Sequence, residues 1–103
     1  MIRHVVLFKL KPNVSREERD RWIEMSRLAH TRIASIRAFS IGPDLMGLPR
    51  SYDVAVMVDF DSLDDVREYA EHPEHLPVVE LARDLSEHIA SVDFEFYPKG
   101  NRP

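Results

Sequence analysis

The sequence predicts an α+β fold in which helices cover one face of a four-stranded antiparallel sheet. Apolar and β-branched runs alternate with segments of helical periodicity, and turn-forming residues separate them. The order is strand, helix, strand, strand, helix, strand, which is the βαββαβ pattern of a ferredoxin-like sheet. A chain of 103 residues has room for one core. We therefore expect a single domain over residues 1–103.

The first strand is expected over residues 2–10, where large apolar side chains end at a Lys-Pro-Asn turn signal. Ser15 and Glu18 then have the spacing of a capping box, which predicts a helix over residues 16–34. Apolar side chains recur in this segment at every third or fourth position: Trp22, Met25, Ala29 and Ile33. Such a stripe predicts that the helix lies against the sheet.

The rest of the chain is expected to form the other strands and helices of the sheet. Strands are expected over residues 38–42 and 52–60, with a Pro-containing loop over residues 43–51 between them. Ser62 and Asp65 predict the start of a short helix that ends near Glu71. A further helix is expected over residues 76–88, with Pro77 in its first turn, followed by a strand over residues 92–97 and a polar tail over residues 98–103.

The central strands are apolar on both sides, which predicts a homodimer. Helices can cover only one face of such a sheet, so the other face of a monomer should be polar. Here both alternating sets are apolar, with Val5 and Leu7 on one side of the first strand and Val6 and Phe8 on the other. An uncovered apolar face of several hundred Å² marks an interface. We expect two sheets to face each other across a two-fold axis.

Composition limits the partners and the compartment. A net charge of -4 with both signs interspersed argues against a nucleic-acid partner. The absence of cysteine excludes disulfides and thiolate metal sites, and a cytoplasmic location is expected. The first strand is interrupted by Arg3, His4 and Lys9, so it resembles neither a secretory signal nor a membrane span, and no membrane partner is expected.

His4 is an unusual residue within the apolar run of the first strand. If Val5 and Leu7 pack on the helices, His4 points into the space between the two paired sheets. An apolar space with a few polar groups is typical of a small-molecule pocket. The alternative is a hydrogen-bonded strand histidine with a structural role. The expected lining comes from the first and third strands: His4, Val6, Phe8, Val54 and Val56.

The segment Tyr-Ala-Glu-His-Pro-Glu-His at residues 69–75 gathers a phenol and two imidazoles. A spacing of three puts Tyr69 and His72 on one helical face, and Pro73 predicts a bend that re-aims His75. Such groups move protons near neutral pH, although a solvated surface bend is the alternative. Zinc requires three or four ligands, so His72 and His75 alone do not predict a metal site. Solvated helix positions explain His30 and His88.

Three parts of the sequence together resemble the stress-responsive dimeric α/β-barrel (Dabb) family. They are the opening Ile-Arg-His-Val-Val-Leu-Phe-Lys-Leu-Lys-Pro, the strand at residues 52–60, and the Tyr-x-x-His-Pro-x-His segment that begins at Tyr69. The resemblance covers nearly the whole chain. It implies a ferredoxin-like protomer whose sheet pairs with that of a second copy to close a dimeric α/β barrel.

The resemblance also implies two functions. The first is a homodimer with an apolar cavity that binds a small molecule, in which His72 would contribute to ligand binding. The second is a polyketide-cyclase-like lyase that needs no cofactor and acts on a small carbonyl compound through His4, Tyr69 and His75. In that case His75 would act as the base, and His4 or Tyr69 would donate a hydrogen bond to the enolate oxygen. Where the cyclase has a further pocket histidine, this chain has Val54.

Overall fold

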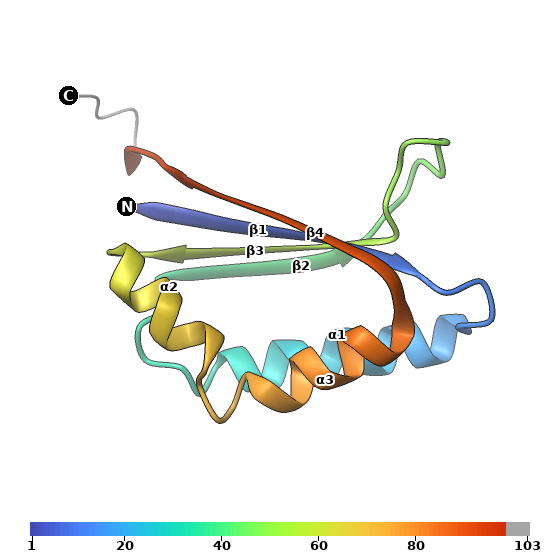
Figure 1. The fold of residues 1–103 in the computed structure, drawn as a ribbon, viewed down its shortest axis with the longest axis horizontal. Coiled ribbons are helices and arrows are strands. Elements are labelled where there is room, and N and C mark those ends of the chain that lie inside the picture. Colours follow the sequence, from blue (N-terminus) through green and yellow to red (C-terminus); the bar gives the residue numbers. More distant parts are fainter. Residues whose placement is uncertain (99–103) are drawn as a thin grey trace.

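The computed structural model describes residues 1–98, so residues 99–103 of the predicted tail lie outside the described residues. One antiparallel sheet with the strand order β2-β3-β1-β4 carries all four strands (Figure 1). This confirms the predicted ferredoxin-like fold. The elements are β1 (Ile2–Leu10), α1 (Arg16–His30), β2 (Ala38–Pro43), β3 (Val54–Phe60), α2 (Leu63–Ala70), α3 (Leu76–Leu85) and β4 (Ser86–Glu95). None of these helices is both long and apolar enough to cross a membrane.

The largest differences from the predicted boundaries lie at the end of α1 and at the junction of α3 with β4. Helix α1 ends at His30 instead of residue 34, because the Thr31 hydroxyl donates to the Leu28 carbonyl at 2.6 Å and closes the last turn. Helix α3 ends at Leu85, and β4 begins at the next residue instead of at residue 92. Ser86 and His88 pair with Leu10 and Lys9 at the end of β1, on either side of a β-bulge. Pairing with another strand therefore overrides the local helical pattern of residues 86–88.

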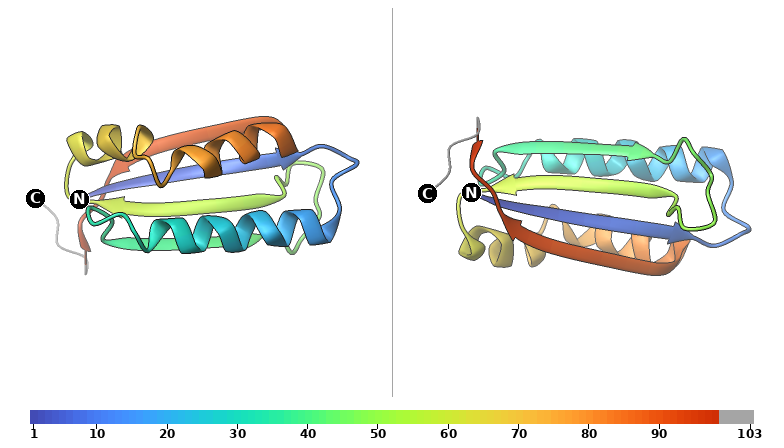
Figure 2. Two further views of the ribbon diagram at one scale, coloured as in Figure 1. Left: turned by 90° about the horizontal axis from the view of Figure 1, so that it is seen from below. Right: turned by 90° about the horizontal axis from the view of Figure 1, so that it is seen from above.

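The helices form one layer on a single face of the sheet (Figure 2). Helix α1 runs along the β2 and β3 side, and α2 and α3 run along the β1 and β4 side. The core lies between these layers, where Val58, Phe60 and Trp22 are almost completely buried. The Trp22 indole N–H donates to the Val78 carbonyl at 3.1 Å and so links α1 to α3. The Phe8 ring packs edge-on against Trp22 at 4.8 Å.

The strand register gives His4 an orientation opposite to the prediction. His4 pairs with Val58, Val6 with Val56, and residues paired in this way share one face of the sheet. Since Val56 and Val58 are buried beneath the helices, His4 and Val6 also face the helices. The expectation that Val5 would pack on the helices is therefore wrong. The bulky alternating residues of β3 fix this register, because a shift by one residue would expose them.

The opposite face of the sheet is open and largely apolar, as predicted. Met57, Val92 and Phe94 are 37%, 56% and 44% exposed. They share this face with smaller and half-buried side chains from three strands: Val5, Leu7, Ala55 and Ala90. The sheet therefore has two apolar faces, of which the helices cover one.

The Trp22 hydrogen bond provides a test of the core. In Trp22→Phe most of the apolar volume remains, but the Val78 carbonyl loses the indole donor that links α1 to α3. We expect the free energy of unfolding to fall by about 1–3 kcal/mol, measured by urea denaturation at fixed protein concentration. Leu28→Ala, at a half-exposed position of the same helix, is the control and should change stability by much less. An equal effect of both substitutions would contradict this account of the core.

Candidate functional site

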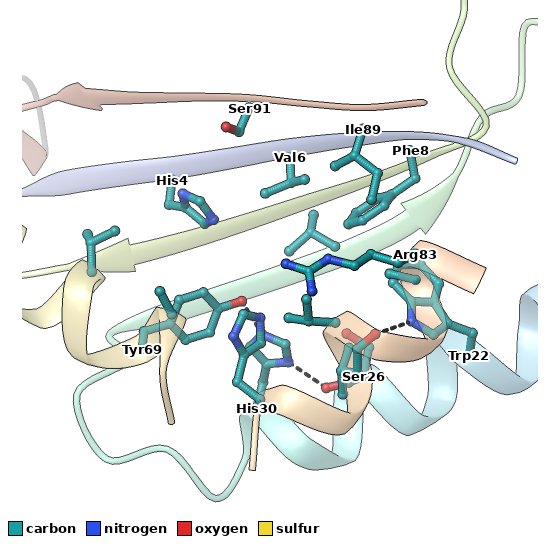
Figure 3. A pocket seen from close by; sticks show the side chains of 17 residues that line it. His4, Val6, Phe8, Trp22, Ser26, His30, Tyr69, Arg83, Ile89 and Ser91 are labelled. Atoms are coloured by element: carbon teal, nitrogen blue, oxygen red, sulfur yellow. Dashed lines mark hydrogen bonds between the residues drawn. The ribbon is translucent and has the colours of Figure 1, made fainter. Parts of the chain in front are cut away.

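A cavity of about 470 Å³ lies between the sheet and the helices of one protomer (Figure 3). Its apolar wall includes Val6, Phe8, Val56 and Trp22. The polar side chains that line it are His4, Ser26, His30, Tyr69, His75, Arg83 and Ser91. The cavity was predicted between two paired sheets, and that placement is wrong because His4 faces the helices. An apolar pocket with a few convergent polar groups is the usual form of a small-molecule site.

Most of the residues predicted for the site meet at this cavity. His4, Tyr69 and His75 all line it. Among the predicted ligand-binding residues, Val6, Phe8 and Val56 line it as well, but Val54 and His72 do not. Val54 is 1% exposed and belongs to the packed core.

His72 has a structural contact instead of a place in the cavity wall. Its Nδ1 accepts a hydrogen bond from the backbone N–H of Glu74 at 3.1 Å. The imidazole thereby stabilises the turn between α2 and α3. His72 therefore lies outside the wall of this cavity, and its role in ligand binding stays a prediction.

That turn brings His75 onto Tyr69. Helix α2 ends at Ala70, and the backbone N–H groups of His72 and His75 close successive turns by donating to the carbonyls of Tyr69 and His72. The His75 and Tyr69 rings stack with their centroids 3.9 Å apart. The sequence predicted a bend at Pro73 that re-aims His75, and the structure has that bend.

His30 belongs to the site, although it was predicted to be a solvated helix residue. It is 4% exposed. Its Nδ1 lies 2.6 Å from the Ser26 carbonyl oxygen, and its Nε2 lies 2.7 Å from the Tyr69 hydroxyl. The sequence held a signal for this placement, since Trp22, Ser26 and His30 recur at intervals of four and so share one face of α1.

These contacts fix the positions of two protons. A carbonyl oxygen can only accept, so Nδ1 of His30 carries the hydrogen and Nε2 accepts from the Tyr69 hydroxyl. Burial lowers the pKa of His30, against the opposing effect of its hydrogen bond to Ser26, and keeps the ring neutral. Burial also raises the pKa of Tyr69 well above its usual value, so the phenol stays protonated. Tyr69 therefore donates a hydrogen bond to Nε2 of His30.

His4 is oriented by Asp93, which lies directly opposite it on β4. His4 Nδ1 lies 2.5 Å from the Asp93 carboxylate. A carboxylate can only accept, so Nδ1 carries a hydrogen, and in the neutral ring Nε2 has a lone pair. Figure 3 shows the ring pointing from β1 into the cavity toward Tyr69, and the two ring centroids are 5.7 Å apart.

His75 is a neutral and incompletely bonded ring. Burial is the main cause that lowers the pKa of His75 to about 4, and the nearby imidazole of His30 further disfavours a second positive charge here. Within residues 1–98 its buried Nδ1 has no hydrogen-bond partner, and the same holds for the buried hydroxyl of Ser26. Two unsatisfied polar atoms in one cavity wall are unusual in a native protein, and a bound ligand would satisfy them.

The polar groups of the cavity are suited to proton transfer and hydrogen bonding. In the described part of the chain, no three or more His, Cys, Asp or Glu side chains are arranged to hold a metal ion. The cavity instead combines one imidazole oriented by a carboxylate, one neutral imidazole, and a phenol bonded to a third imidazole. This combination can polarise a carbonyl and accept a proton from a neighbouring carbon.

Comparison with known proteins gives consistent matches over nearly the whole chain. The family described as "Stress responsive A/B Barrel Domain" (Dabb) matches residues 2–96. An uncharacterised protein of Streptomyces coelicolor is 34% identical over 98 residues, which cover 93% of this chain and 100% of that protein.

Solved structures with the same fold include two proteins of unknown function. A dimeric ferredoxin-like protein from Thermobifida fusca is 26% identical with a TM-score of 0.85, and the match covers 92% of this chain and 90% of that one. A dimeric protein of ferredoxin-like fold from Bacteroides fragilis is 33% identical with a TM-score of 0.78, over 92% and 95% of the two chains.

The lowered pKa of His75 predicts a pH dependence of stability. The unfolded ring takes up a proton near pH 6.5, whereas the folded ring does so only near pH 4. The unfolded state therefore binds more protons in this interval, and the free energy of unfolding should fall as the pH falls through it. His75→Phe keeps the ring stacked on Tyr69 but removes the titration, so its stability should decline less steeply.

Urea denaturation of both proteins between about pH 7 and pH 4 measures this difference. His88→Gln, at an exposed position of β4, is the matched control and should keep the wild-type slope. The burial of a neutral His75 is contradicted if the slope is the same in His75→Phe and in the wild type.

Proposed function

The chain belongs to the stress responsive A/B barrel domain (Dabb) family, and on that premise we propose that each protomer of a homodimer binds a small, partly apolar carbonyl compound and catalyses proton transfer at the carbon beside the carbonyl. The observation that carries this proposal is the pairing of His4 with Asp93 at the wall of an apolar cavity. A cytoplasmic location and a role under stress are part of the same proposal.

His4 is the proposed base. Asp93 holds the tautomer in which Nε2 can accept a proton, and its charge stabilises the imidazolium that forms, as a carboxylate does in other carboxylate–histidine pairs. The proton of the substrate C–H bond passes to Nε2. The electron pair of that bond forms the C=C bond of the enolate, and the carbonyl oxygen takes up the negative charge.

His75 is the proposed donor to that oxygen, which reverses the roles expected from the sequence. A ring with a pKa of about 4 is a weak base, but as a neutral imidazole it carries one N–H that can be directed at an oxygen. Tyr69 supports it by stacking at 3.9 Å, and His30 holds the Tyr69 hydroxyl. The enolate then takes a proton at another position or attacks a second carbonyl, which gives an isomerisation or an aldol-type cyclisation.

The size of the expected effect limits the substrate. A positioned base contributes about 10²–10⁴-fold to a rate. This is sufficient for a C–H bond that is already acidic, as in a β-dicarbonyl compound, and insufficient for an unactivated carbon. The proposed substrate class is therefore an activated carbonyl compound with an apolar portion that contacts Phe8, Val6 and Val56.

The proposed homodimer rests on the open face of the sheet. This face carries the exposed side chains of Met57, Val92 and Phe94. Figure 1 shows the loop between β2 and β3 rising from the sheet on the side away from the helices, and its residues Leu45 and Met46 are 93% and 71% exposed. A second copy packed on this face would cover both the sheet and the loop. The similar proteins from Thermobifida fusca and Bacteroides fragilis are described as dimeric, which supports a dimer for this chain as well.

Exchange of substrate hydrogen for deuterium tests the proposed proton transfer. We expect the protein to accelerate exchange at the activated carbon of benzoylacetone or phenylpyruvate in D₂O, followed by proton NMR. His4→Gln should lower the protein-dependent rate by about 10²–10⁴-fold, and Asp93→Asn should lower it as well because the tautomer is no longer fixed. His88→Gln is the matched control and should keep the wild-type rate. Equal exchange by His4→Gln and the wild type would contradict the proposal.

Light scattering after size-exclusion chromatography tests the dimer. The wild-type mass should be twice the 12.0 kDa of one chain. The double variant Met57→Asp/Val92→Asp places two charges on the open face and should elute as a monomer, because unpaired buried charges are costly. Leu28→Asp, on the exposed side of α1, should remain dimeric. A wild-type protein of one chain's mass would refute the assembly.

A further inference from the structure

Arg83 places a permanent positive charge at the cavity, and none of the mechanistic steps above uses it. Among the described residues that line the cavity, Arg83 alone is charged at every physiological pH. Figure 3 shows its side chain pointing back over the cavity from α3. We infer, given the proposed function, that the substrate is an organic acid whose carboxylate binds Arg83 while its activated carbon lies beside His4.

The position of Arg83 follows from the geometry of α3. His75 precedes this helix, and Val79, Ala82 and Arg83 lie on its cavity side. Side chains of a helix tilt toward its N-terminus, so a long side chain at position 83 extends toward the end of α3 where His75 and Tyr69 lie. The guanidinium can thus reach a ligand in the cavity even though the residue as a whole is exposed.

Arg83 also lacks the partners that most arginines of this protein have. Over residues 1–98 it makes no salt bridge, although Glu80, Asp84 and Glu87 are close to it in sequence. Other arginines have carboxylate partners within the salt-bridge distance: Arg3, Arg19, Arg27, Arg32, Arg37 and Arg67. The planar fork of Arg83 therefore remains available to a ligand, and a carboxylate is the group that it matches in two parallel hydrogen bonds.

The electrostatics of the cavity favour an anion near Arg83. His30 and His75 are neutral and so add no positive charge. The carboxylate of Asp93 is already hydrogen-bonded to His4, the residue opposite it on β1. A bound acid would thus meet the Arg83 guanidinium, which has no salt-bridge partner among the described residues. The nearby carboxylate of Asp93 is already paired with His4.

Two further atoms would bind the other oxygens of such a ligand. The Ser26 hydroxyl, in a residue that is 1% exposed, lines the cavity without a hydrogen-bond partner among the described residues. The same is true of Nδ1 of His75. A keto acid offers a carbonyl oxygen and a carboxylate within a few bonds of each other, so one molecule can satisfy Arg83 and these two atoms together.

Equilibrium binding of phenylpyruvate and of its uncharged methyl ester tests this inference. At low ionic strength the wild type should bind the acid at least about tenfold more tightly than the ester, because the charge-assisted hydrogen bonds exist only with the acid. In Arg83→Gln the affinity for the acid should fall about tenfold, and that for the ester should stay unchanged. Isothermal titration measures both affinities without any need for turnover.

The control is Arg21→Gln, which removes a charge from an exposed position of α1 and should leave both affinities at the wild-type value. The inference is overturned if the wild type binds acid and ester equally, if it binds neither, or if Arg83→Gln weakens both to the same degree. Deuterium exchange separates this inference from the proposed function. Exchange that depends on His4 but is equal for acid and ester would refute the role of Arg83 alone. A preference for the acid without exchange would refute only the catalysis.

Discussion

The pairing of β1 with its two neighbours determines which chemistry the cavity can perform. Register with β3 turns His4 toward the helices, and register with β4 puts Asp93 directly beside it. A shift of β1 by one residue would move His4 to the open face and separate it from both Asp93 and Tyr69. The buried valines of β3 prevent that shift, so the apolar core fixes the position of a polar site.

The two faces of the sheet serve different purposes in this account. The helix side encloses the cavity and removes its polar groups from water, which lowers the pKa of His75 and of His30 and raises that of Tyr69. The open side retains apolar side chains that a second copy would cover. The proposed site is therefore complete within one protomer, and dimerisation acts on stability while the site residues act on the ligand.

Much of the fold could be predicted because apolar periodicity reports directly on burial. The orientation of His4 could not, since Val5 and Leu7 are as apolar as Val6 and Phe8, and only the pairing with β3 distinguishes the two faces. Asp93 was not recognised because the pairing of β1 with β4 is a long-range property.

The missed role of His30 has a different cause. Ser26 and His30 lie on the buried face of α1 but are polar, so a search for apolar periodicity does not identify them as buried. The bend in the Tyr69 to His75 segment could be predicted because it is a local effect of Pro73. The side of that bend on which the His72 ring lies could not be predicted, because it depends on the contact with Glu74.

The central claim is that Asp93 fixes His4 as the base of the cavity, and nitrogen-15 NMR of the histidine rings tests it most directly. In its neutral form His4 should carry its proton on Nδ1 and a lone pair on Nε2, and Asp93→Asn should shift the tautomer population. A neutral His4 ring with its proton on Nε2 would contradict the account, because no lone pair would then face the ligand.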